Sequence, residues 1–256
     1  MREFTVAACQ ATLRYHDLPG EAVPTLFIHG LGCAGSFDYP SVAACGSLAQ
    51  HRRILVDLLG SGFSDKPAAF DYSIASHAAT LAELVEHLQL SRLVVFGHSM
   101  GGAVAIVLAR LLGDKLQALI LSEANLDAGG GFFSRQIAQY SEDEFVAAGH
   151  AALVAQSRDS GNSQWAATLA LSAPWAIHRS AVSLIAGQTP SWRQILYQLP
   201  MTKGFLFGSQ SLPDVDFTEL PRHGVPVLTV ADAGHSMAWE NPAGVATAIR
   251  QLLPAP

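Results

Sequence analysis

Residues 92–113 read RLVVFGHSMGGAVAIVLARLLG, and this stretch decides the predicted fold. Its first part, RLVVFG at 92–97, is a short apolar run that is typical of a buried strand. Its second part, SMGGAVAIVLARLLG at 99–113, is a longer apolar run that favours a helix ending at Gly113. The stretch therefore predicts a strand, a sharp glycine-rich turn and a helix.

The same alternation continues on both sides of this stretch. Further strands are predicted at TLFIHG (25–30), RILVDLLGSG (53–62), LQALILS (116–122), GFLFG (204–208) and VPVLTVA (225–231). Helices are predicted at SIASHAATLAELVEHLQL (73–90) and from about Asn241 to Leu253, the first because its leucines recur at helical spacing. Strands that alternate with helices indicate a parallel sheet covered on both faces.

The alternation breaks between about Asp127 and Pro200. This part is helical and irregular, and it holds three of the four tryptophans, Trp165, Trp175 and Trp192. We interpret it as an insertion that lies over the carboxyl ends of the parallel strands, where ligands bind in such sheets.

Composition excludes several classes of function. The 256 residues are 50% hydrophobic and 14% charged, enough for a sizeable core, and the net charge of −6 argues against a nucleic-acid partner. No apolar stretch approaches the length of a membrane span, and the first residues lack a secretory pattern. The three cysteines, Cys9, Cys33 and Cys45, form neither a metal-binding spacing nor an even disulfide set, so we expect free thiols in the cytoplasm.

The turn itself carries a chemical signal. Its residues 97–101, GHSMG, fit the pattern G-x-S-x-G between a strand and a helix, which is the setting of a nucleophile elbow. Gly97 and Gly101 let the backbone turn sharply, and the hydroxyl of Ser99 is then exposed. The helix that begins there favours developing negative charge at its N-terminus. Ser99 is therefore the predicted nucleophile.

With this elbow, the chain resembles the α/β-hydrolase fold family, in its serine-nucleophile form with a helical cap. The resemblance rests on four motifs: HGLG at 29–32, DLLGSGFSDKP at 57–67, GHSMGG at 97–102 and AGHSMAWENP at 233–242. It implies a mostly parallel eight-stranded sheet with flanking helices.

The resemblance also implies how the chain is divided. Residues 1–126 and 201–256 form the hydrolase core, and residues 127–200 form the helical cap. The first two strands come from FTVAACQATLRYHD at 4–17.

Among ten histidines, His235 is the predicted general base. It follows the last predicted strand and precedes the C-terminal helix, which agrees with the family order of serine, acid, histidine. The imidazole takes the proton of Ser99 and returns it to the leaving group. The resemblance gives His29 a structural use, and His98 is expected to point away from the serine hydroxyl.

The acid of the triad has two candidates. The family usually carries it after the strand that follows the cap, but that position is Ser211 here, and the nearby Asp214 lies beyond Pro213. A subset of the family, including some haloalkane dehalogenases, carries the acid after the strand before the cap, where this chain has Glu123. Either carboxylate can fix the histidine tautomer. We favour Glu123, because the usual position holds Ser211, and we keep Asp214 as the alternative.

The backbone N–H groups of Leu31 and Met100 are the expected oxyanion hole. The cap is rich in aromatic residues, which suits a small or medium hydrophobic acyl substrate. We therefore expect a cofactor-free and metal-free serine esterase that forms an acyl-enzyme. Hydrolysis of an amide, a lactone or a carbon–carbon bond uses the same groups, and a small-ligand receptor on a hydrolase scaffold is a further alternative. The sequence does not define an oligomeric state.

Overall fold

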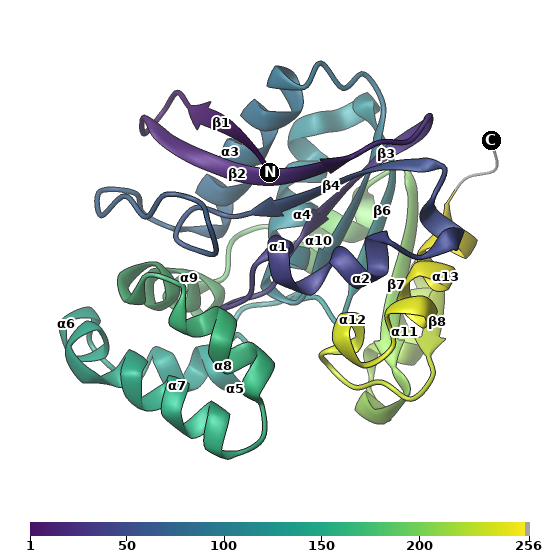
Figure 1. The fold of residues 1–256 in the computed structure, drawn as a ribbon. Coiled ribbons are helices and arrows are strands. Elements are labelled where there is room, and N and C mark those ends of the chain that lie inside the picture. Colours follow the sequence, from purple (N-terminus) through teal and green to yellow (C-terminus); the bar gives the residue numbers. More distant parts are fainter. Residues whose placement is uncertain (254–256) are drawn as a thin grey trace.

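An eight-stranded sheet runs through the protein (Figure 1), in a computed structural model that describes residues 1–253. The strand order is β1-β2-β4-β3-β5-β6-β7-β8. The bounds are β1 Arg2–Val6, β2 Ala11–Leu18, β3 Ala22–Ile28, β4 His51–Asp57, β5 Leu93–His98, β6 Leu116–Ser122, β7 Thr202–Gly208 and β8 Val227–Val230. The β1–β2 and β2–β4 pairs are antiparallel, and the remaining pairs, from β4–β3 to β7–β8, are parallel. The predicted mostly parallel eight-stranded sheet is confirmed.

Helices cover both faces of this sheet. One face packs against α3 (Ile74–His87), α4 (Met100–Leu112) and α10 (Trp192–Gln198), and the other packs against α2 (Pro40–Ala43) and α13 (Pro242–Leu252). Three short helices complete this part: α1 Gly35–Asp38, α11 Asp216–Arg222 and α12 Met237–Glu240. The predicted flanking helices are therefore present.

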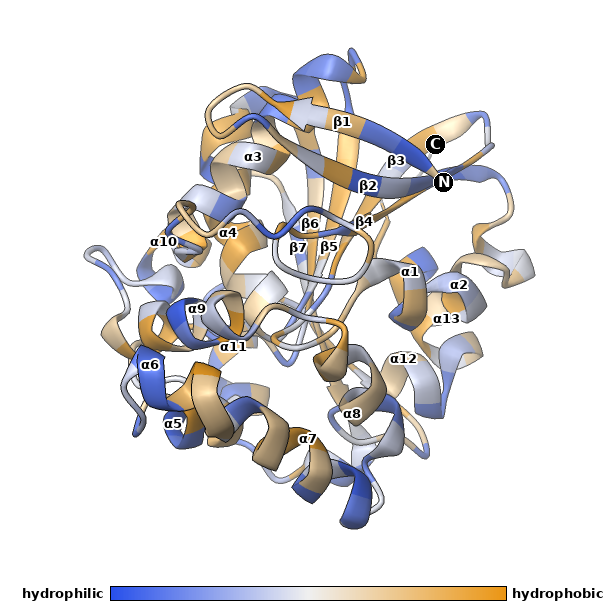
Figure 2. Ribbon diagram, turned by 60° about the vertical axis from the view of Figure 1, so that its left-hand side comes forward, coloured by the Kyte–Doolittle hydropathy of each residue, from blue (hydrophilic) through white to orange (hydrophobic). Residues whose placement is uncertain are grey.

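The central elements are apolar because they are buried on all sides. In α4 every residue except Arg110 and Leu111 is buried, so this helix has no polar face. Parallel strands are likewise covered on both faces, and residues 93–97 of β5 are all buried. Figure 2 shows the resulting band of hydrophobic residues through β5, β6 and β7.

A helical segment connects β6 to β7. It contains α5 Phe132–Ile137, α6 Glu142–Glu144, a π-helical turn Phe145–Gly149, α7 His150–Asp159, α8 Ser163–Ala170 and α9 Pro174–Ala186, followed by α10. Helices α5 to α9 share a small core of their own, which includes Phe145, Trp165 and Leu169. Helix α10 packs on α4 instead, and it adds Trp192 and Leu196 to the core beside the sheet.

The predicted elements match the observed ones within a few residues at most ends. The strand expected at 225–231 is shorter than predicted, because only residues 227–230 pair with β7. Among residues 1–253, no helix combines the length and the apolar character that crossing a membrane requires.

Candidate active site

Ser99 occupies a strained turn between β5 and α4. Its φ is 53° and its ψ is −121°, a conformation that residues with a side chain seldom adopt. The turn is held by the backbone on both sides: Ser99 N donates to the carbonyl of Ser122 at 2.9 Å, and Ser99 O accepts from Gly102 N at 2.9 Å and Asn125 N at 3.2 Å. These bonds fix the turn that presents the serine side chain.

The two glycines of this turn are required by close backbone contacts. A Cβ at Gly97 would lie 2.5 Å from the carbonyl oxygen of Gly101, and a Cβ at Gly101 would overlap the carbonyl oxygens of Ile28 and His29. The spacing G-x-S-x-G thus follows from the packing of α4 against β3 and β5.

Glu123 and His235 are in direct contact. His235 Nδ1 lies 2.7 Å from Glu123 Oε2, while Glu123 Oε1 accepts from the backbone N–H of Gly208 at 2.9 Å. The glutamate follows the last residue of β6, and its own N–H donates to the carbonyl of Leu206 in β7. Its carboxylate therefore lies across the carboxyl ends of β6 and β7 and spans the gap between them.

These contacts keep the carboxyl group charged. Burial is the largest single influence on the pKa of Glu123 and raises it, but the hydrogen bond and charge of His235 lower it. The Gly208 N–H and the Ser211 hydroxyl add to that effect, so that the pKa falls to about 2. A carboxylate with this pKa is ionised throughout the neutral range.

The two predicted acids lie in different surroundings. Asp214 is exposed, and its Oδ1 accepts from the N–H of Asp216 at the start of α11 at 2.7 Å. Asp214 borders a cavity of about 160 Å³ together with Glu123 and His235. Within residues 1–253 it makes no hydrogen bond to the histidine. The structure therefore brings Glu123 to the histidine and leaves Asp214 as a turn residue.

The pKa of Glu123 predicts an acid-dependent contribution to stability. A carboxyl group with a folded-state pKa of about 2 and an ordinary value of 4.5 stabilises the fold above about pH 4.5, and this stabilisation is lost as the pH falls towards 2. Between pH 5 and pH 2 the free energy of unfolding should fall by about 2–3 kcal/mol more in the wild type than in Glu123→Gln. Urea unfolding followed by circular dichroism at each pH measures this difference. Equal losses in the two proteins would contradict the prediction.

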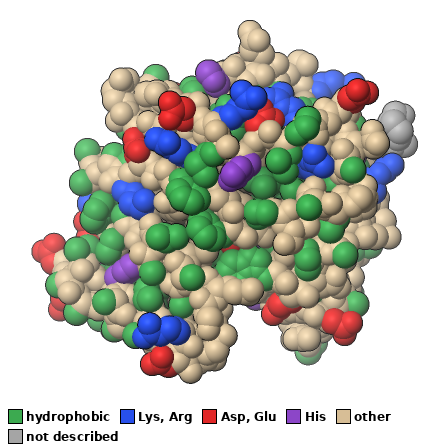
Figure 3. Space-filling model, in the orientation of Figure 1, with side chains coloured by type: hydrophobic (Ala, Val, Ile, Leu, Met, Phe, Trp, Pro, Cys, Tyr) green, Lys and Arg blue, Asp and Glu red, His purple; other side chains and the backbone are tan. Residues whose placement is uncertain are grey.

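Ser99 and His235 line one cavity of about 490 Å³ at the carboxyl ends of the strands. Figure 3 shows the molecule notched between α5–α9, at lower left, and the C-terminal elements. No hydrogen bond joins Ser99 Oγ to His235 in the part of the chain that the structure describes. In serine hydrolysis this bond is needed when the substrate is bound and the serine proton is transferred.

His98 and His29 both lie near the elbow, and their rings make different hydrogen bonds. His98 Nδ1 bonds the carbonyl of Ser122 at 3.0 Å, and burial together with His235 lowers the pKa of His98 to about 3. Its ring centre lies 4.6 Å from that of His235. A neutral His98 thus packs against the predicted base.

His29 is buried and orients the backbone next to Leu31. The Leu58 N–H donates to His29 Nε2 at 3.0 Å, so the hydrogen of the neutral ring is on Nδ1 and is donated to the Gly30 carbonyl at 2.8 Å. Burial lowers the pKa of His29, which favours this neutral form. Because the N–H of Leu31 belongs to the same planar peptide as the Gly30 carbonyl, the His29 bond also fixes the direction of that N–H.

The two predicted oxyanion donors lie beside Ser99. Met100 is the first residue of α4, where an N–H has no intrahelical acceptor. Leu31 borders the cavity, and its carbonyl accepts from Trp165 Nε1 at 2.8 Å. This last bond connects α8 to the Leu31 loop, and no sequence pattern pointed to it, because it joins residues 134 positions apart.

Some aromatic residues of the helical segment line the cavity, and Trp165 does so while also belonging to the core of α5–α9. Phe132, Phe133 and Trp165 line the cavity, with Leu184. Four further aromatic residues pack into or against the cores: Phe145, Trp175, Trp192 and Tyr197.

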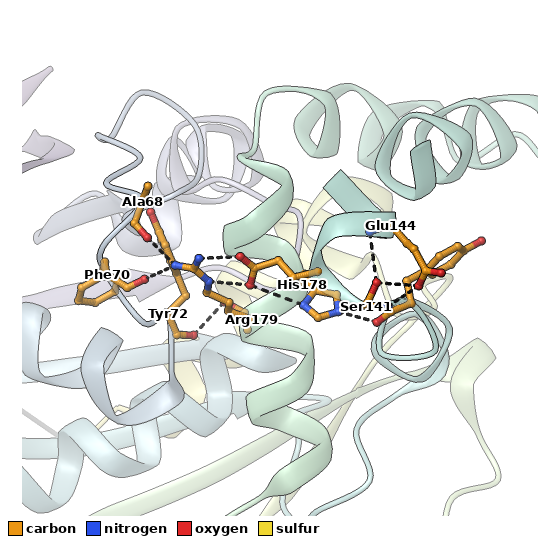
Figure 4. A network of polar contacts seen from close by, with 10 residues as sticks. Ala68, Phe70, Tyr72, Ser141, Glu144, His178 and Arg179 are labelled. Carbon is orange, nitrogen blue, oxygen red and sulfur yellow. Dashed lines mark hydrogen bonds and ion pairs between the residues drawn. The ribbon is translucent and has the colours of Figure 1, made fainter. Parts of the chain in front are cut away.

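The arginines of the helical segment do not line the cavity. Arg179 donates to Glu142 and to the carbonyls of Ala68 at 2.6 Å and Phe70 at 2.8 Å (Figure 4). Arg193 bonds Asp127 and Asp216. These two arginines therefore link the helical segment to residues of the rest of the protein by hydrogen bonds and ion pairs. Among residues 1–253, no group of three or more His, Cys, Asp or Glu side chains is arranged to hold a metal ion.

Comparison with known proteins gives matches in sequence and in structure. Residues 23–147 match the family model described as alpha/beta hydrolase fold. A 2-hydroxy-6-oxo-2,4-heptadienoate hydrolase of Pseudomonas putida is 31% identical over 117 residues, which are 43% of this chain and 40% of that protein. The chain spans about a third to two fifths of the length of the curated relatives it matches.

The solved structures match over almost the whole chain. A thermophilic esterase from Thermogutta terrifontis has a TM-score of 0.79 at 23% identity, covering 98% of this chain and 96% of that one. The N-acyl homoserine lactonase AidH has a TM-score of 0.78 at 18% identity, covering 98% and 94%. At these identities the likeness describes the fold.

Proposed function

The chain belongs to the α/β-hydrolase fold family, and on that premise we propose that it is a cofactor-free serine hydrolase of carboxylic esters. The observation that carries the proposal is the 2.7 Å contact between His235 Nδ1 and Glu123 Oε2, beside a serine held in a strained turn. A carboxylate at this nitrogen fixes the tautomer in which Nε2 is free to accept a proton.

The first half of the reaction forms an acyl-enzyme. Ser99 Oγ attacks the ester carbonyl while His235 Nε2 takes its proton, and Glu123 stabilises the imidazolium that results. The backbone N–H groups of Leu31 and Met100 donate to the carbonyl oxygen as it becomes negative. His235 then gives the proton to the departing alcohol.

The second half releases the acid. Water occupies the place of the alcohol, His235 takes one of its protons, and the resulting hydroxide attacks the acyl carbon. The proton returns to Ser99 Oγ when the carbon–oxygen bond to the serine breaks.

In this proposal the helices α5 to α9 act as a cap over the substrate. Phe132, Phe133 and Trp165 give the cavity an apolar wall, which suits a small or medium hydrophobic acyl group. Helix α10, which packs on α4, then belongs with the hydrolase core. The three cysteines are free thiols, which is consistent with our proposal of a cytoplasmic location.

Other reactions with the same groups remain alternatives. The Pseudomonas putida relative carries the name of a hydrolase of 2-hydroxy-6-oxo-2,4-heptadienoate, which favours carbon–carbon bond hydrolysis as the second candidate. Dehalogenation and epoxide opening are disfavoured, because those relatives use an aspartate where this chain has Ser99. The alternative of a small-ligand receptor was based on the absence of an acid at Ser211. The contact of Glu123 with His235 argues against this alternative, because it supplies a carboxylate for the histidine.

A matched set of substrates tests the reaction class. We expect kcat/KM to be highest for phenyl butyrate and lower for N-phenylbutyramide, γ-butyrolactone and a β-diketone. Release of phenol, aniline or acid measures the four rates under one condition. A higher kcat/KM for the diketone would replace the ester proposal by carbon–carbon bond hydrolysis.

A further inference from the structure

A second, smaller cavity adjoins the active site beside the predicted base. It measures about 30 Å³, and five residues line both it and the larger cavity: Cys33, His98, Trp165, His235 and Ser236. Ser99 does not line it, and its wall continues from His235 into α12, with Met237 and Trp239. About 10–15 Å³ is enough for one water molecule, so this cavity holds a group of one or two heavy atoms.

Asp38 is a polar residue of this cavity that the proposed mechanism does not use, and among residues 1–253 it carries a buried oxygen without a hydrogen-bond partner. Its side chain belongs to the short helix α1 and is 5% exposed. The unpaired oxygen is Oδ1. Leaving such an oxygen unpaired costs about 1–3 kcal/mol, so an occupant that donates a hydrogen bond would relieve this cost.

The surroundings select a neutral occupant. Burial raises the pKa of Asp38 to about 8, against the opposing effect of the Cys33 thiol, so at neutral pH the group is a carboxylic acid. His98 is neutral as well, because burial and His235 lower its pKa to about 3. A hydroxyl group, which donates and accepts, matches this environment better than an ammonium or a carboxylate ion.

The position of the small cavity identifies the part of the substrate that reaches it. His235 must give its proton to the departing alcohol, so the alcohol part of an ester lies on the histidine side of Ser99. The small cavity lies on that side, because residues 235–239 form much of its wall. The larger cavity, with Phe132 and Phe133, is left for the acyl group.

We propose that the small cavity is a subsite that receives a hydroxyl group carried by the alcohol part of the ester, with Asp38 as its hydrogen-bond partner. This inference rests on the proposed ester hydrolysis and names its substrate class: esters of small diols or related polyhydroxy alcohols. Asp38 is then a binding residue that sets specificity, and it takes no part in bond breaking.

The test measures binding without turnover. In Ser99→Ala, calorimetry gives the dissociation constants of 2-hydroxyethyl butyrate and propyl butyrate, which differ by a hydroxyl in place of a methyl group. A second pair, 3-hydroxypropyl and butyl butyrate, allows for a longer reach to Asp38. The preference is the dissociation constant of the alkyl ester divided by that of the hydroxylated ester. For at least one pair we expect this ratio to fall about fivefold to tenfold when Asp38→Leu is added to Ser99→Ala.

Control variants separate binding from folding. Asp38→Asn should keep much of the preference, because its amide oxygen accepts the same hydrogen. Asp114→Leu, at the exposed far end of α4, should keep all of it. If Asp38→Leu does not fold, Asp38→Ala takes its place, because a smaller side chain cannot clash.

The outcomes distinguish this inference from the proposed function. An unchanged preference for both pairs in the Asp38 variants would overturn the subsite, and would mean that the cavity holds only water. A preference that depends on Asp38, in a protein whose intact Ser99 form hydrolyses neither ester, would support the subsite and contradict the ester hydrolase.

Discussion

Replacing Ser99 by alanine is expected to lower kcat for phenyl butyrate by about 10⁴- to 10⁶-fold, since removal of a nucleophile that acts with its base abolishes nearly all of their joint effect. KM should change little, because the cavity walls stay in place. The Ser99 hydroxyl makes no hydrogen bond among the described residues, and alanine keeps the same Cβ at φ 53°, so we expect a melting temperature close to that of the wild type. Phenol release and thermal unfolding measure the two quantities.

The matched control for this substitution is Ser160→Ala, at the exposed end of α7. It should keep the wild-type kcat. If Ser99→Ala retained a tenth of the wild-type kcat, with contaminating esterase excluded by a second purification, Ser99 would not be the nucleophile.

Replacing Glu123 by glutamine is expected to lower kcat by about 10²- to 10⁴-fold. Both oxygens of the carboxylate act as acceptors, one from the Gly208 N–H and one at His235 Nδ1. A glutamine has a single acceptor, so one of these two contacts must face an NH₂ group instead. If the NH₂ group faces the histidine, it donates to Nδ1 and forces the ring hydrogen onto Nε2, where it blocks proton transfer from Ser99.

Asp214→Asn is the control for this substitution, because Asp214 accepts from a turn N–H and makes no hydrogen bond to His235 among the described residues. Its kcat should stay within about twofold of the wild type, as for an exposed side chain that makes no hydrogen bond to the reacting groups. Steady-state kinetics on both variants decide between the two carboxylates. A collapse of kcat in Asp214→Asn, with Glu123→Gln still active, would reverse the assignment.

The fold could be predicted from the sequence where local pattern and global topology agree. Residues 92–113 carry a buried strand, a glycine turn and an apolar helix, and β5 and α4 form there because Gly97 and Gly101 permit close contact. The position of α10 beside the sheet was harder to predict from the sequence. Its residues resemble the helices before it, and only the packing of Trp192 and Leu196 on the sheet side separates it from α5–α9.

The site could be predicted in part, for a physical reason. Ser99, His235 and Glu123 each follow a strand, and the carboxyl ends of parallel strands meet at one edge, so chain order alone brings them near each other. Asp38 follows no strand, and its burial beside His98 depends on how α1 packs. The bond from Trp165 to the Leu31 carbonyl likewise depends on how α8 lies over the sheet.

The most direct test of the central claim, a serine nucleophile activated by His235, is the intact mass of the protein after reaction with an active-site fluorophosphonate. The proposed site predicts one adduct in the wild type, located on Ser99 by peptide mapping, no adduct in Ser99→Ala, and slower labelling in Glu123→Gln than in Asp214→Asn. An unlabelled wild type, or an adduct that persists in Ser99→Ala, would contradict the claim.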